Sequence, residues 1–222
     1  RGLQKALERE YPGVFLILGN DDLRAEETSI RAGGSGGLWQ YVHNRRVRLG
    51  DFTLYGYSFV PPTPFSLKDW ERYDVSAYVD PGCTHPMEGR HSVPVTEREL
   101  KYATIKDDLE KLVESADLAR SFFLFHTPPH DTCLDRAALD GRMIDHVPLD
   151  VHVGSIAVRR FIEVHQPYLT LHGHVHESAR LTGSWKQSIG RTISISAAHD
   201  GPELSLVRFS LENLESAARE LI

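Results

Sequence analysis

The segment that decides the fold is Ser121-Phe122-Phe123-Leu124-Phe125-His126, an apolar run of strand-forming residues that ends at a histidine. A helical pattern begins near Ser155, and the strand-like run Tyr168–Leu171 follows it. Two further strands are predicted at 192–198 and 204–211, where apolar and polar residues alternate. A strand–helix–strand unit followed by a run of strands favours a layered α/β fold with a mixed sheet, in which two sheets pack together.

Further elements are predicted in the first half of the chain. Residues 1–10 have the pattern of a helix end, and the continuous apolar run Val14–Leu18 predicts a strand buried on both faces. The strand-like runs on either side of Gly50-Asp51 predict a hairpin. The sequence Thr96–Glu99 is a capping box, and apolar residues then recur at helical spacing as far as Ala116. We therefore expect one long helix in this region.

Two stretches are predicted as loops, and the tail is predicted as a helix. The glycine-rich stretch 31–37 lacks the Gly-Lys-Ser/Thr ending of a phosphate-binding loop, so we expect a mobile surface loop. The stretch 127–153 is a long loop rich in Asp and His, and such loops are usually functional or disordered. A short helix is expected at 212–221. We expect residues 1–222 to form a single domain whose N-terminal strands are absent, since a central parallel strand usually has earlier partners.

Composition describes an ordinary globular protein. The chain has 222 residues, of which 41% are hydrophobic and 25% charged, and its net charge is −6. No face rich in Lys and Arg is evident beyond the cluster at 45–48, so nucleic acid is not an expected partner. No apolar run approaches the length of a membrane span, so no membrane partner is expected. Cys83 and Cys133 lie in loops and form no disulfide framework, which favours a reducing cytoplasm.

Four side chains that can bind a metal each follow an apolar run. They are Asn20, His126, His174 and His176. Strand ends converge at one edge of an open α/β sheet, where such folds place their ligands. Taken singly, each residue has an ordinary alternative, because a lone histidine is often a hydrogen-bonded structural group and Gly-Asn suits a simple turn. Their coincidence at strand ends favours a transition-metal site.

This pattern resembles the calcineurin-like metallophosphoesterases, in particular the small prokaryotic branch of that superfamily. The matching blocks are Gly19-Asn20-Asp21-Asp22, His126 and Gly173-His174-Val175-His176. Further matches span nearly the whole chain: Thr63-Pro64-Phe65, His126-x-Pro128-Pro129, Leu134-Asp135, His152-Val153-Gly154-Ser155 and Glu177-Ser178. The resemblance implies a two-sheet α/β/β/α sandwich of the metallophosphoesterase type.

The resemblance also implies a ligand set. Asn20, His126 and His174 would bind the second of two divalent transition-metal ions, and His176 would bind the first. Imidazole and amide ligands do not select sharply among Mn, Fe, Zn, Co and Ni. The implied activity is hydrolysis of a small phosphomonoester or phosphodiester by attack of a metal-bound hydroxide.

The sequence departs from the family pattern in two ways. The Asp-x-His and Gly-Asp blocks, which supply the other ligands of the first ion and the bridging carboxylate, would lie upstream of residue 1. Asp21 stands where many relatives have a histidine, and an ionised carboxylate is a poor general acid. Asp22 is expected to orient the turn by accepting backbone hydrogen bonds.

Two other functions are compatible with the sequence. A non-catalytic protein-interaction scaffold would retain the phosphoesterase fold without the chemistry, and an incomplete domain would depend on pairing at its exposed sheet edge. Several other polar residues are close enough in sequence to rim the site, although solvated loop residues are the simpler interpretation. They are His130, Asp131, Cys133, His146 and His152. His172 is left without a role.

Overall fold

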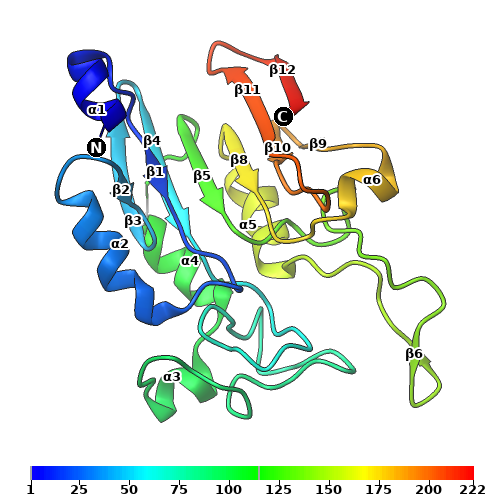
Figure 1. Ribbon diagram of the computed structural model, residues 1–222. Helices are drawn as coiled ribbons and strands as arrows, with labels where there is room; N and C mark the ends of the chain where they lie inside the picture. The colour runs from blue at the N-terminus through cyan, green and yellow to red at the C-terminus, as the bar shows by residue number, and fades with distance from the viewer. Residues whose placement is uncertain (1, 115) are drawn as a thin grey trace.

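The computed structural model describes residues 2–114 and 116–222, and a six-stranded mixed sheet runs through its centre (Figure 1). The strand order is β3-β4-β5-β8-β10-β9. Four neighbouring strands in the middle are parallel: β4 (Phe52–Tyr57), β5 (Ser121–Phe125), β8 (Leu169–His172) and β10 (Thr192–Ser196). The edge strands β3 (Arg45–Leu49) and β9 (Lys186–Ile189) are antiparallel to their neighbours. The carboxyl ends of the four parallel strands therefore lie along one edge.

Helices cover one face of this sheet. The helix α4 (Ile105–Val113) buries Ile105, Leu109 and Val113, and α5 (Ile156–His165) buries four apolar residues. These side chains pack against the aromatic rings of β4 and β5 in one continuous core. Ser155 caps α5 by accepting a hydrogen bond from the Val158 amide, as its sequence pattern predicts.

The single helix expected after the capping box is wrong, because the chain forms two. The helix α3 (Glu97–Tyr102) ends at Ala103, whose backbone is extended. Thr104 then accepts a hydrogen bond from the Asp107 amide and starts α4 as a new N-cap. Two threonine caps eight residues apart explain the break, since an N-cap residue needs non-helical backbone angles.

A C-terminal hairpin lies on the opposite face of the sheet (Figure 1). Its strands are β11 (Ser205–Ser210) and β12 (Asn213–Leu221), which pair antiparallel. Leu214 packs with Leu54, Phe122, Leu169 and Ile195 in a second apolar core. The tail helix expected at 212–221 is therefore wrong. Its residues favour a helix by composition, but pairing with β11 and burial of Leu214 override that preference.

The N-terminal segment adds a small two-stranded sheet. The strand β1 (Phe15–Leu16) runs parallel to β2 (Gln40–Tyr41). The apolar run from Val14 is half-buried as far as Ile17, so the prediction of a strand buried on both faces is wrong. This follows from its contacts, since β1 pairs with β2 alone among the described strands.

The remaining elements are short. The helix α1 (Gly2–Leu7) and the turn η1 (Glu8–Glu10) match the helix end expected at 1–10. The turn η2 (Arg24–Glu26) leads into α2 (Glu27–Gly34), so the loop predicted at 31–37 is wrong for residues 31–34, whereas residues 35–37 do form a turn. The loop 127–153 carries the hairpin of β6 (Met143–Ile144) and β7 (Val147–Pro148), and α6 (Ser178–Thr182) follows β8.

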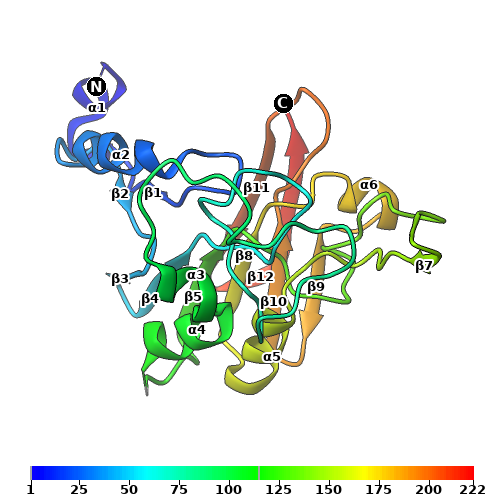
Figure 2. The ribbon, with the colours of Figure 1, turned by 90° about the horizontal axis from the view of Figure 1, so that it is seen from below.

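The N-terminal segment and the β6–β7 hairpin lie at opposite ends of the molecule. Viewed from below, the N-terminal segment lies at one end and the β6–β7 hairpin extends from the other (Figure 2). No described helix is both long and apolar enough to cross a membrane.

Candidate metal centre

Three of the four predicted ligands meet at the carboxyl edge of the sheets. Asn20 follows β1, His126 directly follows β5, and His174 follows β8 after one glycine. The turns after β5 and β8 are joined by a hydrogen bond of 3.0 Å from the Gly173 amide to the His126 carbonyl. Side chains that are far apart in sequence thus lie next to one another.

The amide oxygen of Asn20 lies between the two imidazole rings. Its Oδ1 is 2.8 Å from His126 Nε2 and 2.9 Å from His174 Nδ1, and the ring centroids are 5.2 Å apart. Adjacent ligand atoms around an octahedral ion with bonds of about 2.1 Å lie about 3.0 Å apart. The distances from Asn20 Oδ1 to the two imidazole nitrogens therefore match those between adjacent ligands of one ion. The same distances suit two N–H···O hydrogen bonds, which is the structural alternative.

The turn after β1 holds Asn20 in place. Asp22 Oδ2 accepts a 2.7 Å hydrogen bond from the Gly19 amide, and the Asp22 amide donates back to the Gly19 carbonyl. This is the backbone-orienting role predicted for Asp22. The Asn20 Nδ2 donates to Asp21 Oδ1 at 3.3 Å, which leaves Oδ1 facing the imidazoles.

Both imidazoles are held in the neutral form at physiological pH. Burial lowers the pKa of His126 to about 4, although the carboxylates of Asp22 and Asp21 act in the opposite direction. Burial lowers the pKa of His174 to about 3, and the neighbouring His126 and His176 lower it further. Neutral imidazole is the form that binds metals, because its free nitrogen lone pair is the ligand.

His176 shares the cleft with His126 and His174 but has no hydrogen bond to the other three predicted ligands among the described residues. Its side chain is exposed, and it forms part of the wall of a cleft of about 340 Å³ that His126 and His174 also line. The cleft also contains His199 and Glu203, two polar side chains that were not predicted from the sequence. His199 directly follows the apolar run 192–198, although β10 itself ends at Ser196, so the strand-end rule applied to that run would have found it.

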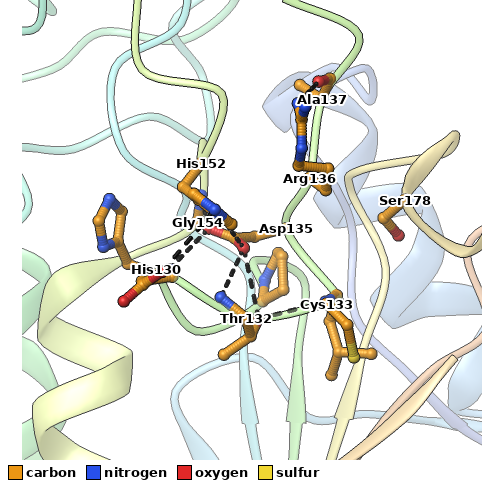
Figure 3. A network of polar contacts seen from close by, with 12 residues as sticks. His130, Thr132, Cys133, Asp135, Arg136, Ala137, His152, Gly154 and Ser178 are labelled. Carbon is orange, nitrogen blue, oxygen red and sulfur yellow. Dashed lines mark hydrogen bonds and ion pairs between the residues drawn. The ribbon is translucent and has the colours of Figure 1, made fainter. Parts of the chain in front are cut away.

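The other polar residues of the 127–153 loop belong to a separate network. Figure 3 shows the buried carboxylate of Asp135 at its centre. Asp135 accepts hydrogen bonds from the amides of Asp131, Thr132 and Gly154 and contacts His152 Nδ1 at 2.8 Å. The predicted rim residues His130, Asp131, Cys133, His146 and His152 are absent from the lining of the cleft. The simpler interpretation of these five residues, as loop residues without a role at the site, therefore fits the structure better.

His172 also lines the cleft, but its ring is held by structural contacts. Its ring is buried, stacks on Phe125, and contacts the Thr127 carbonyl at 2.9 Å and the Thr170 hydroxyl at 2.7 Å. Both ring nitrogens are thereby engaged. His172 is not free to bind a metal in this conformation.

Within residues 2–114 and 116–222, no three side chains of His, Cys, Asp or Glu come together in a way that could hold a metal ion. The candidate centre therefore depends on the amide of Asn20 as its third ligand. The resulting set of one amide oxygen and two imidazoles carries no charge. It fits a single divalent transition metal better than it fits Ca²⁺ or Mg²⁺, which prefer several carboxylate or water oxygens.

We expect Gly19→Ala to disrupt the centre without altering a ligand. A Cβ atom at Gly19 would lie 2.5 Å from His126 Cε1 and 2.7 Å from His126 Nε2, so the ring would have to move. The predicted result is a loss of metal affinity of at least about tenfold, the scale of an outer-shell change. Titration with Zn²⁺ against a chelating dye measures it.

The matched control for that substitution is Gly36→Ala. A Cβ there has no heavy atom closer than 3.8 Å, and the position lies outside the cluster. Equal affinities of the two variants would contradict the crowding of His126 by residue 19.

No protein-family model and no curated protein matches the chain. Seven chains of solved structures do. One is a crystal structure with a TM-score of 0.56 and 15% sequence identity. The similar region covers 100% of this chain and 69% of the other chain. Another is TT1561 of Thermus thermophilus, with a TM-score of 0.51 and 15% identity over 99% of this chain and 77% of that one. At this identity the similarity shows a shared fold alone.

Proposed function

We propose that this protein is a metal-dependent phosphoesterase that hydrolyses a small phosphomonoester or phosphodiester. The observation that carries the proposal is the convergence of His126 Nε2 and His174 Nδ1 on Asn20 Oδ1, each within 2.9 Å, at the edge of a parallel sheet. Ligand sites of open α/β folds occur at this edge. The resemblance of the surrounding sequence blocks to the calcineurin-like family supplies the reaction type.

The residues present fit a divalent transition metal. Asn20, His126 and His174 would hold it, and His176 on the cleft wall would serve a second ion, which makes two in all. Mn, Fe, Zn, Co and Ni all suit these ligands. When bound, such ions neutralise phosphoryl charge and lower the pKa of water. The chain's own contribution is to fix the ligand atoms through the Gly19–Asp22 turn and to keep both imidazoles neutral.

The finer fold assignment belongs to the same proposal. A two-sheet α/β/β/α sandwich is supported by the helices α4 and α5 on one face of the main sheet and the β11–β12 hairpin on the other. In this arrangement β11–β12 is part of the second sheet. The substrate would enter at the cleft lined by His126, His174 and His176.

The alternative is a non-catalytic protein-interaction scaffold with the same fold. The observation in its favour is that no carboxylate joins the three ligand atoms among the described residues. Metal ions held by neutral ligands alone bind less firmly than those with a carboxylate in the set.

Metal content separates the two functions. The purified chain is dialysed against metal-free buffer after loading with Mn²⁺ or Zn²⁺, and the bound metal is counted by mass spectrometry. We expect at least one ion per chain to remain, and a second retained ion would support the two-ion site. A chain that retains none would contradict the phosphoesterase and leave the scaffold.

A further inference from the structure

The turn after β10 forms one wall of the cleft. The register between β10 and β8 pairs Ser196 with His172, and the Ala197 amide donates to the His172 carbonyl at 3.1 Å. The next residues of both strands therefore run side by side, which brings His199 into the same cleft as His174 and His176. Neither the proposed ligand set nor the resemblance assigns His199 a role.

His199 is paired with a carboxylate through one ring nitrogen. Its Nε2 lies 2.9 Å from Glu203 Oε2, four positions along the chain. Its Nδ1 lies 3.9 Å from Asp200 Oδ1, beyond hydrogen-bond distance. The hydrogen bond from His199 lowers the pKa of Glu203, which keeps that carboxylate charged as the acceptor. A histidine oriented by a carboxylate and open at its other nitrogen can transfer a proton.

Several contacts hold the turn that carries His199. Arg219 Nη2 donates to the Ala198 carbonyl at 2.7 Å, and the Ala198 amide donates to Ser196 Oγ. On the other side, Arg180 Nε of the helix α6 donates to Asp200 Oδ2 at 2.7 Å. Hydrogen bonds thus hold the residues on both sides of His199: the backbone of Ala198 and the side chain of Asp200. The side chain is 18% exposed, which leaves it limited access to the cleft.

The proposed reaction lacks a proton donor at the usual position. Asp21 stands where the resembled family has a histidine, and Asp21 is exposed. A carboxyl group is a poorer proton donor near neutral pH than an imidazole, so the acid role at this position is open. Hydrolysis of an ester with a poor leaving group needs a proton donor, since the departing oxygen would otherwise leave as an alkoxide.

We propose that His199, oriented by Glu203, donates the proton to the leaving-group oxygen of the substrate. The proposal rests on the phosphoesterase function above. In the step, a hydroxide oxygen bonds to phosphorus while the bond from phosphorus to the leaving oxygen breaks, and His199 begins as the imidazolium. The electron pair of that bond stays on the leaving oxygen, which takes the proton from His199. The neutral imidazole then takes a proton from water, which restores both the imidazolium and the hydroxide consumed in the step.

The test compares His199→Gln and Glu203→Gln with the wild-type protein on two substrates. One is p-nitrophenyl phosphate, whose leaving group departs without a proton, and the other is an alkyl phosphate. For the alkyl phosphate we expect His199→Gln to lower kcat about 100-fold, the range of general acid catalysis, and Glu203→Gln to have a smaller effect. For p-nitrophenyl phosphate the loss should stay below about threefold.

The control is a second histidine–glutamate pair away from the cleft. His165 Nε2 lies 3.7 Å from Glu110 Oε1. His165→Gln should leave both rates and the metal content unchanged. A readout without turnover is the imidazole nitrogen spectrum of the metal-loaded protein, where Glu203→Gln should shift the His199 Nε2 resonance.

The outcomes separate the two proposals. Equal losses on both substrates, or none, would overturn the role of His199 and leave the phosphoesterase standing. A wild-type protein that hydrolyses neither substrate would overturn both. A selective loss on the alkyl phosphate, with metal content and melting temperature unchanged, supports the proton donor.

Discussion

Replacing His174 by alanine should abolish turnover while leaving the fold intact. His174 Nδ1 is one of the three atoms that converge at the candidate centre, and Asn20 and His126 alone would hold an ion weakly. Changes to residues that only support a ligand cost about 10- to 100-fold in affinity, so loss of a ligand should cost at least about 100-fold. Affinity is measured by competition with a chelating dye, and turnover with p-nitrophenyl phosphate.

The melting temperature of the metal-free variant is the second part of this prediction. His174 has a positive φ of 70°, a conformation that carries a cost for any residue other than glycine. His146 has a φ of 67° and is exposed in the β6–β7 turn, so His146→Ala is the matched control. We expect both variants to melt within about 4 °C of the wild-type protein. Retained turnover in His174→Ala would remove His174 from the centre.

Replacing Asp135 by alanine should have the largest effect on stability. The carboxylate is fully buried and accepts three backbone hydrogen bonds, from Asp131, Thr132 and Gly154, besides its contact with His152 (Figure 3). Its removal leaves the amides of Thr132 and Gly154 buried without this acceptor. Leaving a buried donor without its acceptor costs about 1–3 kcal/mol for each group, so the free energy of unfolding should fall by about 2–6 kcal/mol. Urea denaturation followed by circular dichroism measures it.

The control for Asp135 is Asp140→Ala in the same loop. Asp140 pairs with Arg136 at 2.5 Å, but its side chain is 68% exposed, and surface pairs contribute at most about 1 kcal/mol. An Asp135→Ala variant with the same urea midpoint as Asp140→Ala would show that the network does not hold the loop.

Much of the fold can be predicted from the sequence because apolar runs, helix caps and turn residues each specify the secondary structure of their own segment. The strands β5 and β8, the helix α5 and the hairpin around Gly50-Asp51 were predicted from apolar runs, caps and a turn, and all are present. The wrong predictions of secondary structure fall on segments whose conformation depends on pairing with a distant strand. The residues of β12 favour a helix by composition, but their antiparallel pairing with β11 makes them a strand.

The residues of the candidate site likewise fall into those that the sequence could place and those that it could not. His126 and His174 could be predicted to meet because chain direction alone fixes where parallel strands end. The loop residues His130 and His152 could not be placed, since the position of that loop depends on Asp135, a partner that no periodicity indicates. His199 was missed because it belongs to none of the family blocks, although it too follows a strand.

Asn20 and His174 lie 154 positions apart, and only folding brings them together. Any ligand of this cluster therefore binds the folded chain and not the unfolded one. By mass action such a ligand adds to the free energy of unfolding, by about 2.7 kcal/mol when its concentration is about 100 times its Kd. The lifetime of the protein against proteolysis would then depend on how much of that ligand the surroundings supply.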